Sequence, residues 1–207
     1  CGSHPLGIEN QGVLSMEDFD FSRGLLNSEV AGLGANNSFP RTFVLFDANQ
    51  PSPKGYGLEM SMRNLIMEDA LIVINSGFAK ESPDGRRLMA ARIKESDFLE
   101  GNNNYWLKVT DSSFKNGANN DLEIILYFRI DATCRIKTSY RGSSGMKLGD
   151  QVDFKLTGKP YWKEHRFKVS DANFGKTKGA DLRIQVQGGS PLLGMVMIAT
   201  TAKKGKR

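Results

Sequence analysis

Hydrophobic and polar residues alternate along most of the chain between residues 42 and 200. A period of two places successive side chains on opposite faces of an extended backbone, which predicts β-strands with one buried face. We expect strands at TFVLFD (42–47), YGLEMSM (56–62), ALIVIN (70–75), RLMAARI (87–93), YWLKVT (105–110), DLEIILYFRID (121–131), RIKTSY (135–140), QVDFKLT (151–157), EHRFKVS (164–170), DLRIQVQ (181–187) and LLGMVMIAT (192–200).

Short segments rich in Gly, Asn, Pro and Ser separate these strands, and such residues favour turns. Many short strands without a long helical pattern predict an all-β fold, a β-sandwich. A chain of 207 residues fits one such domain. We expect an N-terminal tether at 1–16, a single β-sandwich domain at 17–200 and a basic tail at 201–207.

One stretch of the chain occurs twice. KVTDSSFKNGANNDLEI (108–124) and KVSDANFGKTKGADLRI (168–184) align without a gap. We expect each copy to end a strand, to bury Phe114 or Phe174 at a corner of the sandwich, and to satisfy loop N–H groups with an aspartate. The alternative is that Asp171 and Asp181 help to hold a structural calcium ion, since calcium prefers oxygen ligands.

The second half of the chain resembles a known family. The segment from Gly158 to Ile198, with the Trp-Lys start of a strand and the later Phe-x-Val-x-Asp-Ala-x-Phe pattern, resembles jelly-roll accessory modules, similar to carbohydrate-binding modules, of bacterial polysaccharide-degrading systems. NNNYWLKVTDSSFKNGANNDLEIILYFRID (102–131) and DGRRLMAAR (84–92) extend the resemblance. It implies a jelly-roll sandwich and a polysaccharide partner. The chain has Tyr140 and Arg141 where the family often has Tyr-Asp, which puts that contact in doubt.

Sugar binding requires exposed aromatic rings that stack on a pyranose, with polar groups around them. The candidate ligand-binding residues are Tyr105, Trp106, Tyr161, Trp162, Tyr140 and Arg141. Strand alternation sends one ring of each adjacent pair inward and the other outward. By the resemblance, Trp162 is the packing residue and Tyr161 the more exposed one. Core packing is the alternative for every one of these rings.

Charge and cysteine content exclude several other classes of function. The net charge is +5, but the densest basic run is the tail KKGKR, and elsewhere basic and acidic residues are mixed. This distribution predicts no nucleic-acid partner. The two cysteines and two histidines form no zinc motif, so we expect no metal site and no cofactor beyond the calcium alternative.

Catalytic motifs are also missing from the sequence. It has no Gly-x-Ser-x-Gly elbow and no phosphate-binding glycine loop before a helix. Acidic residues that could serve glycoside hydrolysis have no distinctive spacing. We therefore expect a protein that is not an enzyme.

Cys1 at the start of the given sequence resembles the lipid-modified cysteine of mature bacterial lipoproteins. Acyl chains on Cys1 would anchor the domain to a membrane. The alternative is that Cys-Gly-Ser-His is a cloning remnant. The sequence thus predicts a non-catalytic, glycan-binding lipoprotein of the bacterial cell envelope, at the outer membrane or cell surface. The alternative is a structural accessory subunit that docks on a membrane protein complex.

Overall fold

The structure is a computed structural model and describes residues 43–48, 57–69, 73–74, 77–78 and 89–201. Its strands are β1 (Phe43–Asp47), β2 (Leu58–Met60), β3 (Leu65–Asp69), β4 (Val73–Ile74), β5 (Gly77–Phe78), β6 (Met89–Ile93), β7 (Asn104–Val109), β8 (Leu122–Ile130), β9 (Cys134–Gly142), β10 (Gly145–Phe154), β11 (Tyr161–Val169), β12 (Leu182–Gln187) and β13 (Leu192–Thr200). One helical turn, α2 (Glu95–Leu99), and a 3-10 turn, η3 (Ser112–Phe114), join them.

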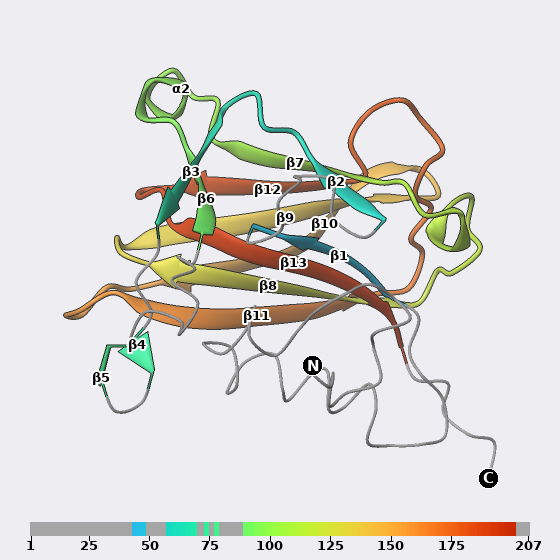
Figure 1. The fold of residues 1–207 in the computed structure, drawn as a ribbon. Coiled ribbons are helices and arrows are strands. Elements are labelled where there is room, and N and C mark those ends of the chain that lie inside the picture. The colour runs from blue at the N-terminus through green and yellow to red at the C-terminus, as the bar shows by residue number, and fades with distance from the viewer. Residues whose placement is uncertain (1–42, 49–56, 70–72, 75–76, 79–88, 202–207) are drawn as a thin grey trace, which may run out of the picture.

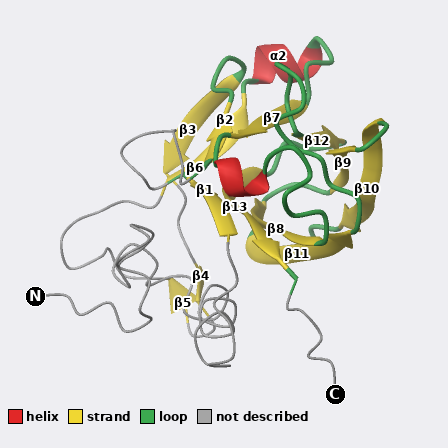
Figure 2. Cartoon of the chain, turned by 90° about the vertical axis from the view of Figure 1, so that its right-hand side faces the viewer, coloured by secondary structure: helices red, strands yellow, loops and turns green. Residues whose placement is uncertain are grey.

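Two antiparallel sheets lie face to face (Figures 1 and 2). The six-stranded sheet has the order β11-β8-β13-β6-β3, and β1 also pairs with β13. The five-stranded sheet has the order β10-β9-β12-β7-β2. The prediction of an all-β sandwich of jelly-roll type is confirmed. In the ranges that the structure describes, no helix has the length and apolar character needed to cross a membrane.

The core lies between the sheets and takes alternate residues from every long strand. In β7, Tyr105, Leu107 and Val109 are buried, whereas the residues between them are only partly covered. In β8 and β13 nearly all side chains are buried, which explains why their sequences are continuously apolar rather than alternating.

Several strands differ from the sequence prediction, and β3 and β5 lie outside every expected range. The expected strand at 56–62 ends at Met60, and β3 starts after a turn at Arg63 and Asn64. β10 starts at Gly145 rather than residue 151, because it is an edge strand whose side chains are largely exposed and carry little hydrophobic signal.

The repeated stretch builds two matching crossovers between the sheets. The first copy leads from β7 in the five-stranded sheet to β8 in the six-stranded sheet, and the second leads from β11 back to β12. Both lie at the same end of the sandwich (Figure 2), where the Asn116 N–H donates to the Phe174 carbonyl at 2.8 Å. Phe114 and Phe174 are both fully buried, which confirms the prediction for these two rings.

The aspartates of the two copies have diverged. Asp181 is fully buried and accepts hydrogen bonds from the N–H groups of Val109, at 3.0 Å, and Gly175, at 2.8 Å. Asp121, at the matching position, is exposed. In the first copy a different aspartate supports the loop, since Asp111 Oδ1 accepts from the Ser113 N–H at 2.8 Å.

Candidate functional site

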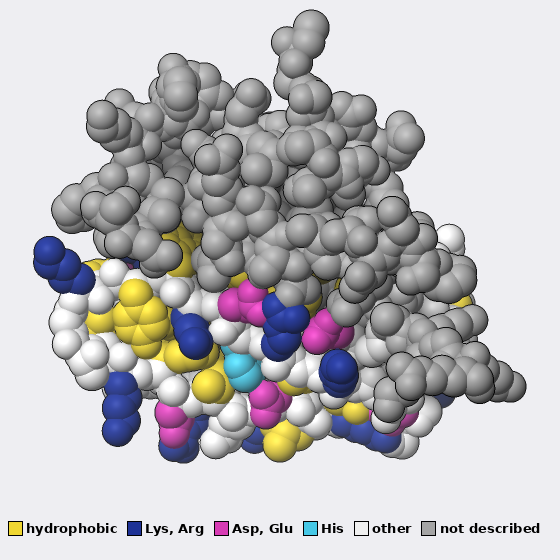
Figure 3. Space-filling view, turned by 90° about the horizontal axis from the view of Figure 1, so that it is seen from below, with side chains coloured by type: hydrophobic (Ala, Val, Ile, Leu, Met, Phe, Trp, Pro, Cys, Tyr) yellow, Lys and Arg dark blue, Asp and Glu magenta, His cyan; other side chains and the backbone are white. Residues whose placement is uncertain are grey.

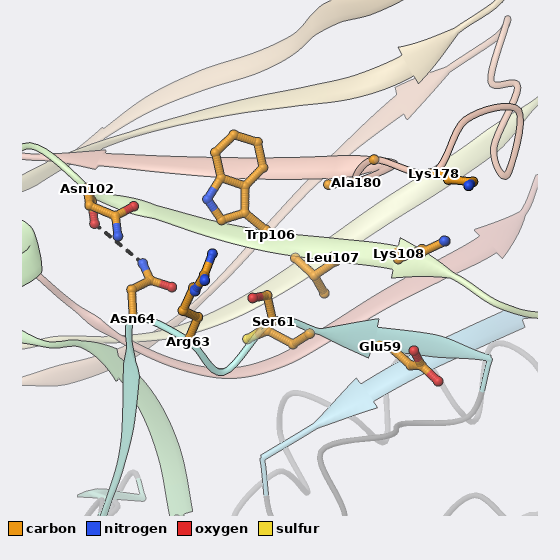
Figure 4. A pocket seen from close by; sticks show the side chains of 12 residues that line it. Glu59, Ser61, Arg63, Asn64, Asn102, Trp106, Leu107, Lys108, Lys178 and Ala180 are labelled. Atoms are coloured by element: carbon orange, nitrogen blue, oxygen red, sulfur yellow. Dashed lines mark hydrogen bonds between the residues drawn. The ribbon is translucent and has the colours of Figure 1, made fainter.

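A groove of about 550 Å³ lies at the β2–β7 side of the five-stranded sheet (Figure 4). It is open to solvent and takes its walls from three parts of the chain: β2 with the turn after it, β7 with the loop before it, and the loop before β12. The lining residues are Glu59, Met60, Ser61, Arg63, Asn64, Asn102, Trp106, Leu107, Lys108, Lys178, Gly179 and Ala180.

Trp106 is the aromatic residue of the groove, and strand alternation explains its position. Its neighbours Tyr105 and Leu107 point into the core, so Trp106 and Lys108 share the outer face of β7. Arg183 lies directly opposite Trp106 on β12. The guanidinium carbon of Arg183 is 5.7 Å from the centre of the indole ring, which is a cation–π distance. The indole is thus held at one side while it remains partly exposed.

One end of the groove is a fixed polar wall. The Asn64 side chain is buried and donates from Nδ2 to the carbonyl oxygens of Asn104, at 2.8 Å, and Asn102, at 3.4 Å (Figure 4). Asn102 in turn donates from its own Nδ2 to Asp97 Oδ1 at 2.9 Å. These amides tie the β2–β3 turn to the start of β7, which fixes the shape of this end.

The loop before β12 forms the other wall, and Arg141 supports it from below. Arg141 donates from Nη2 to the Ala180 carbonyl at 3.0 Å, and its Nε lies 3.6 Å from Asp181 Oδ1. Burial raises the pKa of Asp181, while the hydrogen bonds from Gly175 and Val109 and the charge of Arg141 oppose that rise. Arg141, a candidate ligand contact, is therefore engaged mainly in holding the loop.

Two of the candidate aromatic residues are core residues, which corrects their expected role as exposed platforms. Tyr105 is fully buried, and its hydroxyl donates to the Pro191 carbonyl at 2.8 Å, with the Ala91 carbonyl as a second acceptor within reach at 3.1 Å. Tyr140 is also buried and donates to Asp171. Burial and this bond raise the pKa of Tyr140 to about 12. Neither ring can stack on a ligand in this structure.

Tyr161 and Trp162 lie on β11, in the other sheet, so the structure does not bring them to the groove. Tyr161 packs against the main core, and its hydroxyl donates to the Lys155 carbonyl at 3.1 Å. Trp162 packs on the outer side against Ala90 and Leu192. Both rings are partly buried, so which of the two is the more exposed stays a prediction.

The sequence prediction missed several cations of the groove: Arg63, Lys178 and Arg183 were not among its candidates. Arg183 carried a usable signal, because it alternates with the apolar residues Leu182 and Ile184 and so had to face outward. Arg63 and Lys178 lie in a turn and a loop, where no period fixes the direction of a side chain.

The carboxylates considered for calcium are engaged within the protein. Asp171 accepts from Lys147 and Tyr140, and these bonds hold its pKa below the usual range. Across the described residues, no group of three or more metal-ligating side chains occurs. The calcium alternative remains an untested prediction. The predicted lipid anchor at Cys1 and the predicted tether at 1–16 concern residues outside the described part of the chain.

No family model and no curated protein matches the chain. Among solved structures, it is similar to the C-terminal family 6 carbohydrate-binding module of LamC, a marine laminarinase from Zobellia galactanivorans, at 11% identity and a TM-score of 0.42 over 77% of this chain and 100% of that chain. It is also similar to a family 6 module of Cellvibrio mixtus lichenase 5A, solved with cellotriose, at 10% identity and a TM-score of 0.35 over 76% and 97% of the two chains.

A third similar structure is the family 22 xylan-binding domain of Paenibacillus barcinonensis Xyn10C, at 11% identity and a TM-score of 0.38 over 76% of this chain and 94% of that chain. All three are carbohydrate-binding modules. At these TM-scores the similarity does not assign a ligand, so the case for a function depends on the groove itself.

Proposed function

We propose that the domain is a non-catalytic module that binds a polysaccharide in the groove at Trp106. The observation that carries this proposal is a partly exposed indole set in an open groove with polar walls. An indole face offers apolar area to the C–H face of a sugar ring, while Ser61, Asn102 and the nearby charged groups can meet its hydroxyls. A groove that is open to solvent suits a long chain, because the parts of the polymer that are not bound can extend into solvent.

The test compares three alanine variants in native gels that contain a panel of plant, algal and microbial polysaccharides. Trp106→Ala should abolish retardation by the glycan that retards the wild-type protein, while circular dichroism shows an intact fold. Tyr161→Ala is the matched control, since it removes a candidate ring from the other sheet, and Tyr105→Ala reports the cost of a core cavity. If Tyr161→Ala abolishes retardation and Trp106→Ala does not, the platform lies on β11 and the groove proposal is wrong.

The docking-subunit alternative has its own supporting observation. Met146 and Leu148 on the edge strand β10 are 41% and 58% exposed and lie beside one another on its outer side. An apolar pair on an unpaired strand edge is a feature of protein contact surfaces. If no glycan retards the protein and Leu148→Lys releases it from a co-purifying membrane complex, this alternative replaces the glycan proposal.

The lipoprotein part of the sequence prediction concerns residues outside the described part of the chain. It stays a prediction, with the cell envelope as the expected location. Intact mass of the protein extracted from native membranes decides it: a mass above that of the polypeptide by the acyl groups supports an anchor at Cys1, and the bare polypeptide mass contradicts it.

A further inference from the structure

The groove carries more positive than negative charge. Its lining includes Arg63, Lys108 and Lys178, with Glu59 as the single carboxylate, and Arg183 adds a fourth cation beside the indole. From this arrangement we infer that the ligand is an anionic polysaccharide, one that carries carboxylate or sulfate groups along its chain. This inference rests on the proposed function and specifies its class of ligand.

The four cations are not neutralised by the protein. Within the described residues none of them forms an ion pair, and Lys108 attracts the buried Asp181 only from beyond ion-pair distance. Elsewhere on the same sheet Arg135 pairs with Asp153 at 2.6 Å. On the β11 side of the molecule basic and acidic side chains are neighbours (Figure 3), as in the pair of Arg166 with Glu164. The four cations of the groove therefore have no ion-pair partner among the described residues and can meet charged groups of a ligand.

Arg183 shows this lack of neutralisation most clearly. Its Nε is buried and has no hydrogen-bond acceptor, while its guanidinium lies over the indole of Trp106. A buried donor without an acceptor is uncommon in folded proteins. The aromatic contact orients the guanidinium, but it supplies no counter-charge. An anion at the edge of the indole would supply it and could accept from the terminal nitrogens.

The spacing of the cations fits a polymer rather than a single small anion. Trp106 and Lys108 are two residues apart on one strand, a distance of about 7 Å along β7. Lys178 lies on the same side of Trp106 as Lys108, whereas Arg63 lies below the indole (Figure 4). A sugar stacked on Trp106 would therefore have Arg63 beside it, and the next sugars toward Lys108 would have two more cations nearby.

Single-stranded nucleic acid is the competing anionic polymer, since it also combines stacking with phosphate contacts. Proteins that bind it stack successive bases on several aromatic side chains. Trp106 is the one aromatic residue that lines the groove within the described part of the chain. A single ring fits better with a chain in which charged groups, rather than a series of rings, supply most contacts.

The experiment uses polygalacturonate and its highly methyl-esterified form, which share a backbone and differ in charge, together with a sulfated galactan, a neutral β-glucan and an oligothymidylate. Binding is measured by isothermal titration calorimetry at two NaCl concentrations. The variants are Lys108→Gln, Lys178→Gln and Trp106→Ala. Lys159→Gln is the control, because it removes the same charge far from the groove. Lys159 is exposed in the loop between β10 and β11, beyond the opposite edge of the sheet.

We expect polygalacturonate or the sulfated galactan to bind and the esterified and neutral polymers to bind at least ten-fold more weakly. Each groove lysine variant should weaken binding about three- to five-fold, as typical for exposed charge contacts, and Lys159→Gln should not. Higher NaCl should weaken binding of the wild-type protein. Equal binding of neutral and charged glycans, lost only in Trp106→Ala, would refute the inference and leave the proposed function intact. Tighter binding of oligothymidylate, or no glycan binding at all, would refute both.

Discussion

Removing the carboxylate of Asp181 should destabilise the fold far more than removing that of Asp121, although the two residues occupy the same position in the two copies of the repeat. Asp181 is fully buried, whereas Asp121 is exposed. Asp181→Ala leaves the N–H groups of Val109 and Gly175 without their acceptors. Asp121→Ala leaves no buried group unpaired in this way, and so provides a control with identical chemistry.

The magnitude follows from the two hydrogen bonds. An orphaned buried donor costs about 1–3 kcal/mol, and the Gly175 N–H, which is only part-buried, belongs at the lower end. Arg141 also loses its nearest carboxylate. The raised pKa of Asp181 shows that burial of its charge is unfavourable. The alanine variant no longer buries this charge, which offsets part of the lost stability. We expect a loss of about 2–4 kcal/mol for Asp181→Ala, in line with these terms, and under about 0.5 kcal/mol for Asp121→Ala.

Asp181→Asn separates the two bonds. The N–H groups of Gly175 and Val109 bond to different oxygens, Oδ1 and Oδ2, and an amide has only one oxygen to offer. One N–H would then face an NH₂ group, so we expect a loss between those of the two alanine variants. Urea unfolding followed by circular dichroism at pH 7 measures all three variants. Equal midpoints for Asp181→Ala and Asp121→Ala would refute the account of the buried carboxylate.

Three further predictions concern the core and the acidic groups. Phe174→Ala and Phe114→Ala should each cost about 3–5 kcal/mol in urea unfolding, because both rings are fully buried; a loss under 1 kcal/mol for either would mean that the corner repacks. The pKa of Asp171 is lowered by Lys147 and Tyr140, so its folded value lies below the unfolded value of about 3.9 and its contribution is present above that pH and lost as the pH falls through the folded pKa. The destabilisation caused by Asp171→Asn should therefore be larger at pH 7 than at pH 2.5. The pKa of Asp181 is raised, so the destabilisation caused by Asp181→Ala should show the opposite trend and fall as the pH rises through the acid range. Unfolding curves at a series of pH values test both trends, and two trends of the same sign would contradict the prediction. Burial raises the pKa of the Cys134 thiol to about 11, so at pH 8 it should resist alkylation until urea unfolds the domain, as followed by mass spectrometry of the Cys134 peptide; rapid labelling of the folded protein would contradict its burial.

Strand alternation explains why much of the fold was predictable from the sequence. The long apolar runs of β8 and β13 and the alternation of β7 and β12 fixed which residues form the core. The edge strand β10 was predicted too short, because neither of its faces has to be apolar. The pairing of strands was not predictable, since the sequence does not state which strand lies beside which.

The groove was less predictable than the fold. Alternation made one member of the pair Tyr105 and Trp106 a surface residue, but it did not decide which, and the resemblance to a family did not settle it either. The register of β7 against β12 decides it, by placing Trp106 opposite Arg183. The other cations come from a turn and a loop that approach β7 only in the folded chain. The parts of the site that depend on contacts distant in sequence were those that the sequence could not supply.

The position of β13 has a consequence for how the protein is made. β13 is synthesised after every other described strand, yet it lies inside the six-stranded sheet and pairs with β8, β6 and β1. Until it leaves the ribosome, β1 has no partner in that sheet and one edge of β8 is open. From the synthesis of β8 until that of β13, the chain therefore carries open apolar strand edges, and this is the interval in which aggregation competes with folding.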